Sequence, residues 1–359
     1  MLRFPLQLTV AALFFGLAAE AVAVDGVLEI NQACAVNIGC FPGDDPGFPV
    51  TIQNEVGRSF RLTSDLDLRT EDTNTGAITS DIVGTTLDLN GFDITGPVDC
   101  ALSGASVACS AESGANGITA SFRTTIHDGR VSSFGGDGIN VKSGHVRNVE
   151  ADRNAGAGLR LWNDLTSLLH GSIVSDCISN ANAASGITVS FGHVRNSYAM
   201  FNKSDGITIS GGGSVLESTA RSNGGDGIDV ATNPTTEIVS NCTSVHNLGV
   251  GIRGADGVQI RNNLVSENDG EGILVGKAGV IEGNTVYHNG AHGMFVNSSN
   301  LIAGNTIRKN GGFGIFFFGS QSNYHGNVIS LNRGTVGFGE GNSAINTGQN
   351  TCDDSTTCP

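Results

Sequence analysis

Residues 251–313 read GIRGADGVQIRNNLVSENDGE, GILVGKAGVIEGNTVYHNGAH and GMFVNSSNLIAGNTIRKNGGF when they are written as three rows of 21. Each row begins with a glycine and an apolar residue, and each has an asparagine four residues before the next glycine. A fixed period of this length is typical of a solenoid, in which every unit forms one coil. It is too short for paired-helix repeats and lacks the leucine spacing of a leucine-rich horseshoe.

The same unit covers most of the chain. A glycine followed by an apolar residue opens it at Gly117, Gly138, Gly158, Gly186, Gly206, Gly227, Gly251, Gly272, Gly293, Gly314 and Gly337, mostly 20 or 21 residues apart, with gaps of 28, 24 and 23 as outliers. A second apolar column lies twelve residues before the next glycine, at Val146, Val194, Val215, Val239, Ile260, Ile281 and Ile302. Short runs with period-two alternation, separated by Gly, Asn and Asp, indicate strands joined by tight turns. No stretch carries a helical stripe.

The asparagines that precede the glycines form a column of their own. They are Asn154, Asn202, Asn223, Asn247, Asn268, Asn289 and Asn310. Asparagine tolerates the left-handed backbone conformation that a sharp bend between strands needs, and stacked amides can hydrogen-bond to one another. We therefore expect one asparagine per coil in a structural ladder.

These columns predict an all-β, single-domain parallel β-helix of about eleven or twelve coils with capped ends. At roughly 4.8 Å per coil the rod is about 50 to 60 Å long. An open coil would template further strand addition, so both ends need covers. We expect residues 24–60 to form the N-terminal cap, 61–337 the β-helix, and 338–359 the C-terminal cap.

The repeat resembles the right-handed parallel β-helix superfamily, which includes pectate lyases and carbohydrate-binding and sugar-hydrolysis repeat proteins. The resemblance covers Gly117 to about Val336, and the flanks GDDPGFP (43–49), LDLNGF (87–92) and NTC (350–352) look like secreted bacterial β-helix proteins of unassigned activity. It implies a right-handed helix and says little about function. The chain lacks the acidic constellation of polygalacturonases and the Asp-Pro-His motif of β-helix alginate epimerases.

The first residues look like an export signal. Arg3 precedes an apolar run from Leu6 to Ala19 and the small-residue stretch 21–23, and this run is too short to span a bilayer comfortably. We therefore predict a signal peptide over residues 1–23 and a secreted protein, either periplasmic or extracellular. Nothing later in the sequence is long and apolar enough for a transmembrane helix.

The cysteines fit an oxidising compartment. Six of them form close local pairs, which predicts the disulfides Cys34–Cys40, Cys100–Cys109 and Cys352–Cys358. Cys177 and Cys242 remain, each nine residues before a repeat glycine, and we expect both to be free buried thiols at one position of the coil.

The charge balance restricts the partners. The formal net charge is -15 with only 19 basic residues, whereas binding to nucleic acid needs clustered Lys and Arg. The same balance weighs mildly against an unassisted grip on polyanionic sugars, although a metal ion could reverse it locally.

Three columns are candidate sites, because stacked coils bring residues about twenty apart to within roughly 5 Å of each other. The first holds His246, Glu267 and His288, followed by Lys309. Two imidazoles beside a carboxylate suit zinc or a non-haem transition metal. A solvated, charge-compatible surface ladder explains the same column, and spacing along a line suits a tetrahedral site poorly.

The second candidate is a group of carboxylates, Asp205, Asp226 and Asp229. Asp205 and Asp226 fall on adjacent coils, and two carboxyl groups about 5 Å apart can serve as the nucleophile and acid of a retaining glycosidase. The alternative is that Asp-Gly is simply a good turn pair, since Asp137 makes the same turn without an acidic neighbour.

The third candidate combines Lys142, Arg160 and Trp162, which the repeat places on neighbouring strands. An aromatic face beside cationic donors suits a sugar ring with a carboxylate, and a lyase could use Arg160 as its base. The alternative is a tryptophan packed beneath the long coil of residues 158–185.

The leading hypothesis is a secreted β-helix that binds polysaccharide along its side, either as a binding module or as an enzyme that cleaves it. A non-catalytic structural or adhesive surface protein is the first alternative, because the repeat itself explains most polar columns. A metal-binding periplasmic protein like the copper-insertion β-helix proteins is the second, and it depends on His246, Glu267 and His288. No sequence motif identifies a cofactor.

Overall fold

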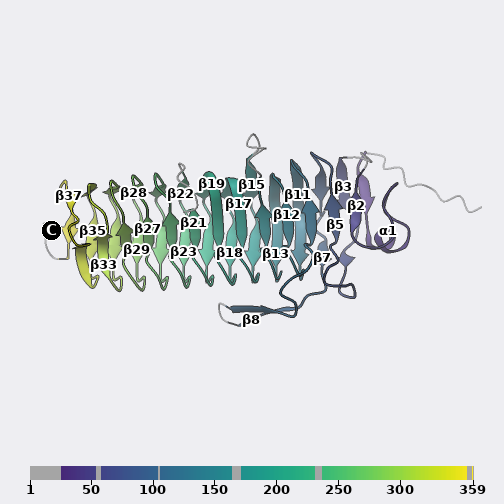
Figure 1. Ribbon diagram of the computed structural model, residues 1–359, viewed down its shortest axis with the longest axis horizontal. Helices are drawn as coiled ribbons and strands as arrows, with labels where there is room; N and C mark the ends of the chain where they lie inside the picture. The colour runs from purple at the N-terminus through teal and green to yellow at the C-terminus, as the bar shows by residue number, and fades with distance from the viewer. Residues whose placement is uncertain are drawn as a thin grey trace, which may run out of the picture.

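The chain folds into a rod of stacked β-strand coils (Figure 1). The computed structural model describes residues 26–53, 58–103, 106–163, 171–230, 237–353 and 358, so the expected signal peptide lies outside the described residues. Coils pair in parallel and in register, so that Ile252 lies beside Ile273 and Ile273 beside Met294. The predicted all-β solenoid is confirmed, with about eleven turns.

Every full coil contributes a strand to each of three parallel sheets. The first sheet holds β2 (Val50–Ile52), β5 (Ile78–Ser80), β10 (Ile118–Ala120), β12 (Ile139–Val141), β14 (Leu159–Leu161), β17 (Ile187–Arg195), β19 (Ile207–Leu216), β21 (Ile228–Val230), β24 (Ile252–Gly254), β27 (Ile273–Val275), β30 (Met294–Val296), β33 (Phe313–Phe317) and β36 (Gly334–Phe338). Strands β17 and β19 continue around a corner into the second sheet.

The second sheet holds β1 (Leu28–Ile30), β3 (Ser59–Leu62), β6 (Thr86–Asp88), β11 (Thr124–Ser132), β13 (Gly144–Asp152), β15 (Ser172–Ser175), β22 (Ile238–Ser240), β25 (Gln259–Arg261), β28 (Val280–Glu282), β31 (Leu301–Ala303), β34 (Ser322–His325) and β37 (Ala344–Asn346). The third sheet receives the ends of β11 and β13, together with β4 (Leu66–Asp67), β7 (Asp93–Thr95), β16 (Ile178–Asn180), β18 (Tyr198–Met200), β20 (Thr219–Arg221), β23 (Thr243–Val245), β26 (Leu264–Ser266), β29 (Thr285–Tyr287), β32 (Thr306–Arg308), β35 (Val328–Ser330) and β38 (Thr351–Cys352).

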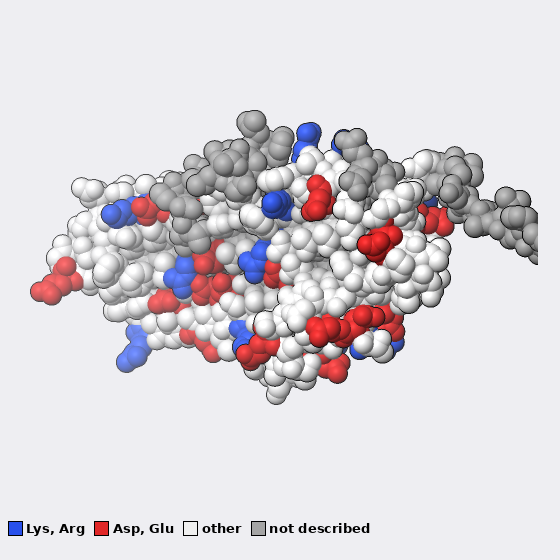
Figure 2. Space-filling model, turned by 45° about the vertical axis from the view of Figure 1, so that its right-hand side comes forward, with Lys and Arg blue, Asp and Glu red and all other residues white. Residues whose placement is uncertain are grey.

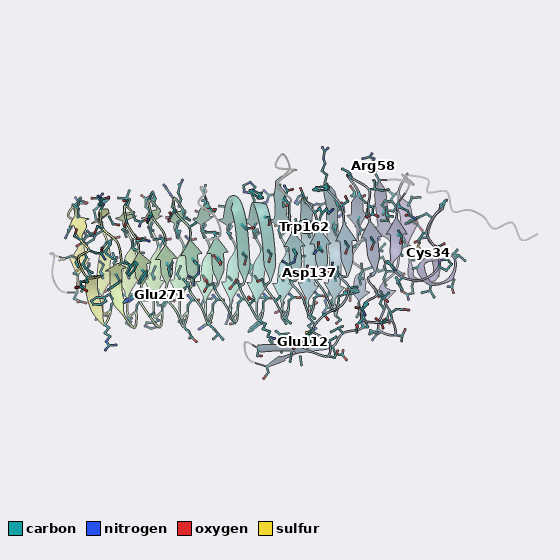
Figure 3. The ribbon with its side chains drawn as sticks, viewed as in Figure 1. Cys34, Arg58, Glu112, Asp137, Trp162 and Glu271 are labelled. Carbon is teal, nitrogen blue, oxygen red and sulfur yellow. A yellow bond between two sulfur atoms is a disulfide. The ribbon has the colours of Figure 1, made fainter. Side chains whose placement is uncertain are left out.

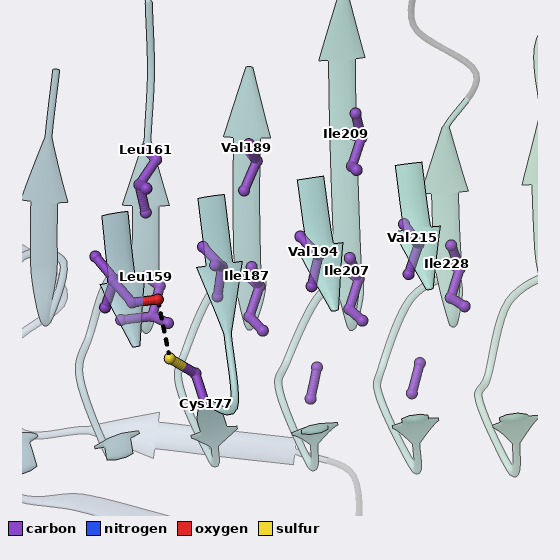
Figure 4. Close-up of a cluster of buried hydrophobic side chains, with 14 of the residues drawn as sticks. Leu159, Leu161, Cys177, Ile187, Val189, Val194, Ile207, Ile209, Val215 and Ile228 are labelled. Carbon is purple, nitrogen blue, oxygen red and sulfur yellow. Dashed lines mark hydrogen bonds between the residues drawn. The ribbon is translucent and has the colours of Figure 1, made fainter. Parts of the chain in front are cut away.

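The core is a set of apolar columns that run along the rod. In the first sheet the two ends of a three-residue strand point inward, so Leu159, Ile187, Ile207 and Ile228 stack on successive coils (Figure 4). The valines and isoleucines predicted for the second inward column are all fully buried. Stacking of like side chains lets every coil bury its apolar face against its neighbours.

The predicted asparagine ladder is confirmed and is longer than expected. Each side-chain amide donates to the amide oxygen on the next coil, at 2.8–3.0 Å, from Asn154 through Asn182 to Asn332. A second ladder links Asn263, Asn284, Asn305, Asn327 and Asn350 at 3.0 Å.

The expected backbone role of these asparagines is wrong. The left-handed residue of each bend is the one before the asparagine, as at Ser222 (φ 53°) and His246 (φ 58°). The asparagine itself is buried and is held by its four amide hydrogen bonds, as at Asn223. The bend therefore places an outward residue in the strained conformation and keeps the amide inside.

Two segments add to the stacked coils. The short helix α1 (Gln32–Asn37) lies at one end of the rod, capped by Asn31, and the disulfide Cys34–Cys40 closes the loop after it (Figure 1). The expected N-terminal cap thus holds a helix too short to show a stripe in the sequence, as well as β1 and β2, which already pair with β3 and β5. The hairpin β8 (Cys100–Ser103) and β9 (Ser106–Cys109) forms an arm outside the helix.

The cysteines behave as predicted. The three expected disulfides are present, and Cys177 and Cys242 are free and buried. Both thiols stand at the position that asparagine takes in the second ladder, since the Cys242 backbone donates to Asn263. Burial raises the pKa of Cys177 to about 12 and that of Cys242 to about 11, so neither is a reactive thiolate. Among the described residues no helix is long and apolar enough to cross a membrane.

Candidate functional site

The outward face of the first sheet collects two of the three predicted sites. Each of its short strands points its middle residue outward, and these residues align along the rod. The column includes Asn140, Arg160, Thr188, Thr208, Asp229, Arg253, Leu274, Phe295 and Phe316. The residue before each repeat glycine lies beside this column. The carboxylates of Asp137, Asp205 and Asp226 are therefore next to these outward residues.

Lys142, Arg160 and Trp162 lie together, and two further residues link them. The Arg160 guanidinium binds Asp137 through Nε–Oδ2 at 2.7 Å and Nη2–Oδ1 at 3.3 Å. The Asn140 amide donates to Asp137 Oδ2 at 2.8 Å and accepts from the Trp162 indole at 2.8 Å. Figure 3 shows Trp162 and Asp137 on neighbouring coils near the middle of the rod. These five residues are called the Trp162 cluster below.

Lys142 contacts two aromatic rings. Its ammonium lies 5.5 Å from the centre of the Phe122 ring and 5.6 Å from that of Trp162. Among the described residues no Asp or Glu forms an ion pair with it. Trp162 remains 37 % exposed. A half-buried cation between two rings, beside an exposed indole, offers an anionic sugar both a charge partner and an apolar surface.

The carboxylates of the second candidate site occupy three neighbouring places. Asp205 Oδ1 accepts the Asp226 backbone N–H at 2.8 Å, and Asp226 is held by the Val250 N–H at 2.7 Å and Arg253 Nε at 2.5 Å. Burial raises the pKa of Asp205, and the nearby charge of Asp226 acts in the same direction. The hydrogen bond to Asp226 raises the pKa of Arg253, and the charges of Asp229 and Glu271 add to this effect.

The Trp162 cluster and the group around Asp226 occupy equivalent places in the repeat, so a comparison shows which of their residues serve the fold. Asp137–Arg160 and Asp226–Arg253 are the same pair at equivalent positions, so an aspartate before the glycine has a structural role in both. The residue two positions after the glycine differs. It is Asn140 in the first cluster, where the amide donates to Asp137, and Asp229 in the second. Because an asparagine fills the equivalent position in the first cluster, the turn does not require the carboxylate of Asp229.

The predicted metal column is only partly assembled. His246 Nε2 lies 3.4 Å from Glu267 Oε2, both side chains being more than 40 % exposed. Among the described residues His246, Glu267 and His288 do not form a set with all ligand atoms within 4.8 Å of one another. All three occupy the left-handed bend position, with φ of 56–58°. A turn that faces solvent accounts for their placement.

Charge and aromatic groups elsewhere on the surface have ordinary explanations. On the face in Figure 2 basic side chains are few, and several of them lie beside acidic ones. Near the C-terminal end His292, Phe295, Phe313 and Phe316 stack, with His292 and Phe316 centroids 4.8 Å apart. Each of these rings has at least one aromatic neighbour within the stack.

The borders of the Trp162 cluster are known on one side. Residues 164–170 of the long coil lie outside the described residues, so the alternative that Trp162 packs beneath this coil stays a prediction. On the other side the β8–β9 arm packs through Val98, Cys100 and Val107 against Ala155 and Ala181. These alanines belong to the turns that precede β14 and β17, so the arm runs beside the edge of the first sheet.

The Trp162 cluster could be found only in part from the sequence. The spacing of the repeat predicted that Lys142, Arg160 and Trp162 lie on neighbouring strands. It missed that Asn140 and Asp137 connect them, and that Phe122 supplies the second ring. Asn140 and Arg160 share the position two residues after a repeat glycine, which was the available signal.

Comparisons with known proteins agree with the fold. Residues 206–356 match the family described as right-handed β-helix region. The A-module of mannuronan C-5 epimerase AlgE6 from Azotobacter vinelandii is similar with a TM-score of 0.50 and 13% identity, over 92% of this chain and 89% of that chain. A double mutant of the periplasmic alginate epimerase AlgG has a TM-score of 0.51 and 11% identity, over 90% and 83%.

No curated protein sequence matches the chain. At such low identities the structural likeness concerns the fold alone. The chain therefore has the fold of the right-handed parallel β-helix proteins, and its residues 206–356 match the family model of that repeat.

Proposed function

We propose that this protein binds polysaccharide along the outward face of its first sheet, with the Trp162 cluster as the main contact. The observation that carries the proposal is the exposed Trp162 ring next to Lys142, an ammonium held by two rings and without a carboxylate partner among the described residues. The indole takes the apolar face of a sugar, and Lys142 takes its carboxylate.

Several features favour an elongated ligand over a small molecule. The outward residues repeat at about 4.8 Å along a straight rod, so a chain of similar units can follow the face from coil to coil. The disulfides fit an oxidising compartment, where polysaccharides are available as ligands. Two of the similar solved structures are named as epimerases of mannuronan and alginate.

The test is a glycan-array screen of the mature protein, with and without divalent cations. We expect binding to acidic glycans, at least a tenfold loss in Trp162→Ala, and no loss in Tyr198→Ala. Tyr198 is a matched control because it is an aromatic residue on the third sheet and is 46 % exposed. Absence of binding under both conditions would refute the proposal and favour the structural or adhesive alternative.

A second function, cleavage of the bound polysaccharide, is favoured by the Asp229 carboxylate beside the Asp226–Arg253 pair. Asp205 would act as the acid, because burial favours its protonated form, and Asp229 as the second carboxylate. Asp226 would position Arg253, since its oxygens already bind the Val250 backbone and that guanidinium.

This assignment makes cleavage depend on protonated Asp205, so the rate declines as the pH rises through its raised pKa. We expect this decline at a higher pH than the ordinary aspartate value of 3.8 allows. Asp205→Asn should abolish release and keep the fold, because Asn116 accepts the Asp137 N–H at the equivalent position. Reducing-end assays across pH provide the measurement, and full activity of Asp205→Asn or Asp229→Asn would exclude this mechanism.

A further inference from the structure

A cluster of metal-ligating side chains lies far from the Trp162 cluster, at the corner between the second and third sheets. Asp88 on β6 and His127 on β11 are paired in register on adjacent coils. Asp128 follows His127 in the left-handed conformation, with φ of 62°, which turns its side chain at the corner. Among the described residues this is the one group of three or more such side chains whose ligand atoms all lie within 4.8 Å of one another.

The distances resemble those of a coordination sphere. His127 Nδ1 lies 2.8 Å from Asp128 Oδ2 and 3.6 Å from Asp88 Oδ1. Zinc bonds to nitrogen and oxygen of about 2.0–2.2 Å place neighbouring ligand atoms of a tetrahedron about 3.3 Å apart. The two distances from His127 lie on either side of this value, and all three ligand atoms lie within 4.8 Å of one another.

The carboxylates are oriented by groups outside the cluster. Arg61 Nε donates to Asp88 Oδ2 at 3.0 Å, and Asn148 Nδ2 donates to Asp128 Oδ1 at 2.7 Å. In both cases the bound oxygen is the one that does not face His127. Asp88 Oδ1 accepts the Asn90 N–H at 2.8 Å and retains a second lone pair. Such outer hydrogen bonds are typical of metal ligands, whose orientation they fix.

Burial and access both suit an ion. The side chains of Asp88 and His127 are 19 % and 12 % exposed, whereas Asp128 is 38 % exposed. Asp128 and Asn148 also line a cavity of about 360 Å³, which gives room for a water or an external ligand at the open side. The cavity wall also holds Asp93, Glu150 and Asp176, and Arg130 in the same wall pairs with Asp93 and Glu150.

We propose that Asp88, His127 and Asp128 bind one divalent transition-metal ion of the zinc class. One imidazole and two carboxylates match zinc, manganese or cobalt, and the open side leaves a position for solvent. The competing explanation is a hydrogen-bonded His127 between two carboxylates, with no ion. The two explanations differ in a measurable property, because only the first predicts stoichiometric metal uptake.

The experiment is titration of the metal-free full chain with Zn²⁺ by calorimetry and with Co²⁺ by visible absorption. We expect one ion per chain, a rise in thermal midpoint when Zn²⁺ is added, and at least tenfold weaker binding in His127→Gln and in Asp128→Asn. The matched control is His246→Gln, which removes the histidine of the exposed His246–Glu267 pair and should bind as wild type does.

Circular dichroism of each variant shows whether it is folded, so that loss of metal binding can be told from loss of the fold. Asp128→Asn is the milder variant, because Asp128 is more exposed and the substitution keeps the His127 imidazole. No uptake by the wild-type chain would overturn the proposal. So would uptake that persists in folded His127→Gln and Asp128→Asn, or that disappears in His246→Gln.

Discussion

Replacing Asn223 with alanine is expected to lower the free energy of unfolding by about 3–5 kcal/mol. Asn223 is fully buried, and its amide oxygen accepts from both the backbone and the side chain of Asn202. Its amide nitrogen donates to the Ala199 carbonyl and to Asn247. Alanine would leave two donors of Asn202 buried without a partner, and each such group costs about 1–3 kcal/mol.

Urea unfolding followed by circular dichroism measures this effect. Asn74→Ala is the matched control, because Asn74 is exposed and bonds only locally to Asp72. We expect the control to change stability by less than about 0.5 kcal/mol. A similarly small change in Asn223→Ala would mean that the ladder is not a main source of stability.

Replacing Gly251 with alanine is expected to destabilise the protein by about 3 kcal/mol through overpacking. A Cβ atom there would lie 2.3 Å from Val265 Cγ1, 2.6 Å from the Gly272 carbonyl oxygen and 2.7 Å from Asn268 Nδ2. The neighbours are a core side chain, backbone and a ladder amide, so none can move without breaking another contact.

Gly171→Ala is the control for this substitution, since its added Cβ would meet only the Phe191 carbonyl oxygen, at 3.5 Å. Thermal melts of the two variants should differ clearly, with Gly171→Ala close to wild type. Equal midpoints would show that the repeat glycines mark turns without being required for close contact between coils.

The solenoid, its inward columns and the first asparagine ladder were predictable from the sequence, because a coil repeats its side-chain directions at every turn. The left-handed residue was not. Sequence shows that Asn223 recurs and that Ser222 varies, but it does not show which of the two carries the strained φ. The second ladder escaped notice because serine and cysteine replace asparagine in its earlier coils, as at Cys177 and Ser197.

The candidate sites were also only partly predictable from the sequence. The repeat spacing predicted that Lys142 lies near Trp162, because equivalent positions on consecutive coils are a known number of residues apart. It could not find the Asp88–His127 pair, because the inserted β8–β9 arm separates these adjacent coils and breaks the period. Long insertions hide neighbours from any argument that depends on a fixed repeat.

The central claim is that polysaccharide binds at the Trp162 cluster, and the chain's single tryptophan offers the most direct measurement. Trp162 fluorescence should be recorded during titration with soluble acidic polysaccharide, chosen from the array, and with a neutral glucan. We predict a saturable change in emission with the acidic chain, weakened at least tenfold in Lys142→Ala and absent with the glucan. Binding detected by calorimetry while the Trp162 emission stays constant would contradict the account.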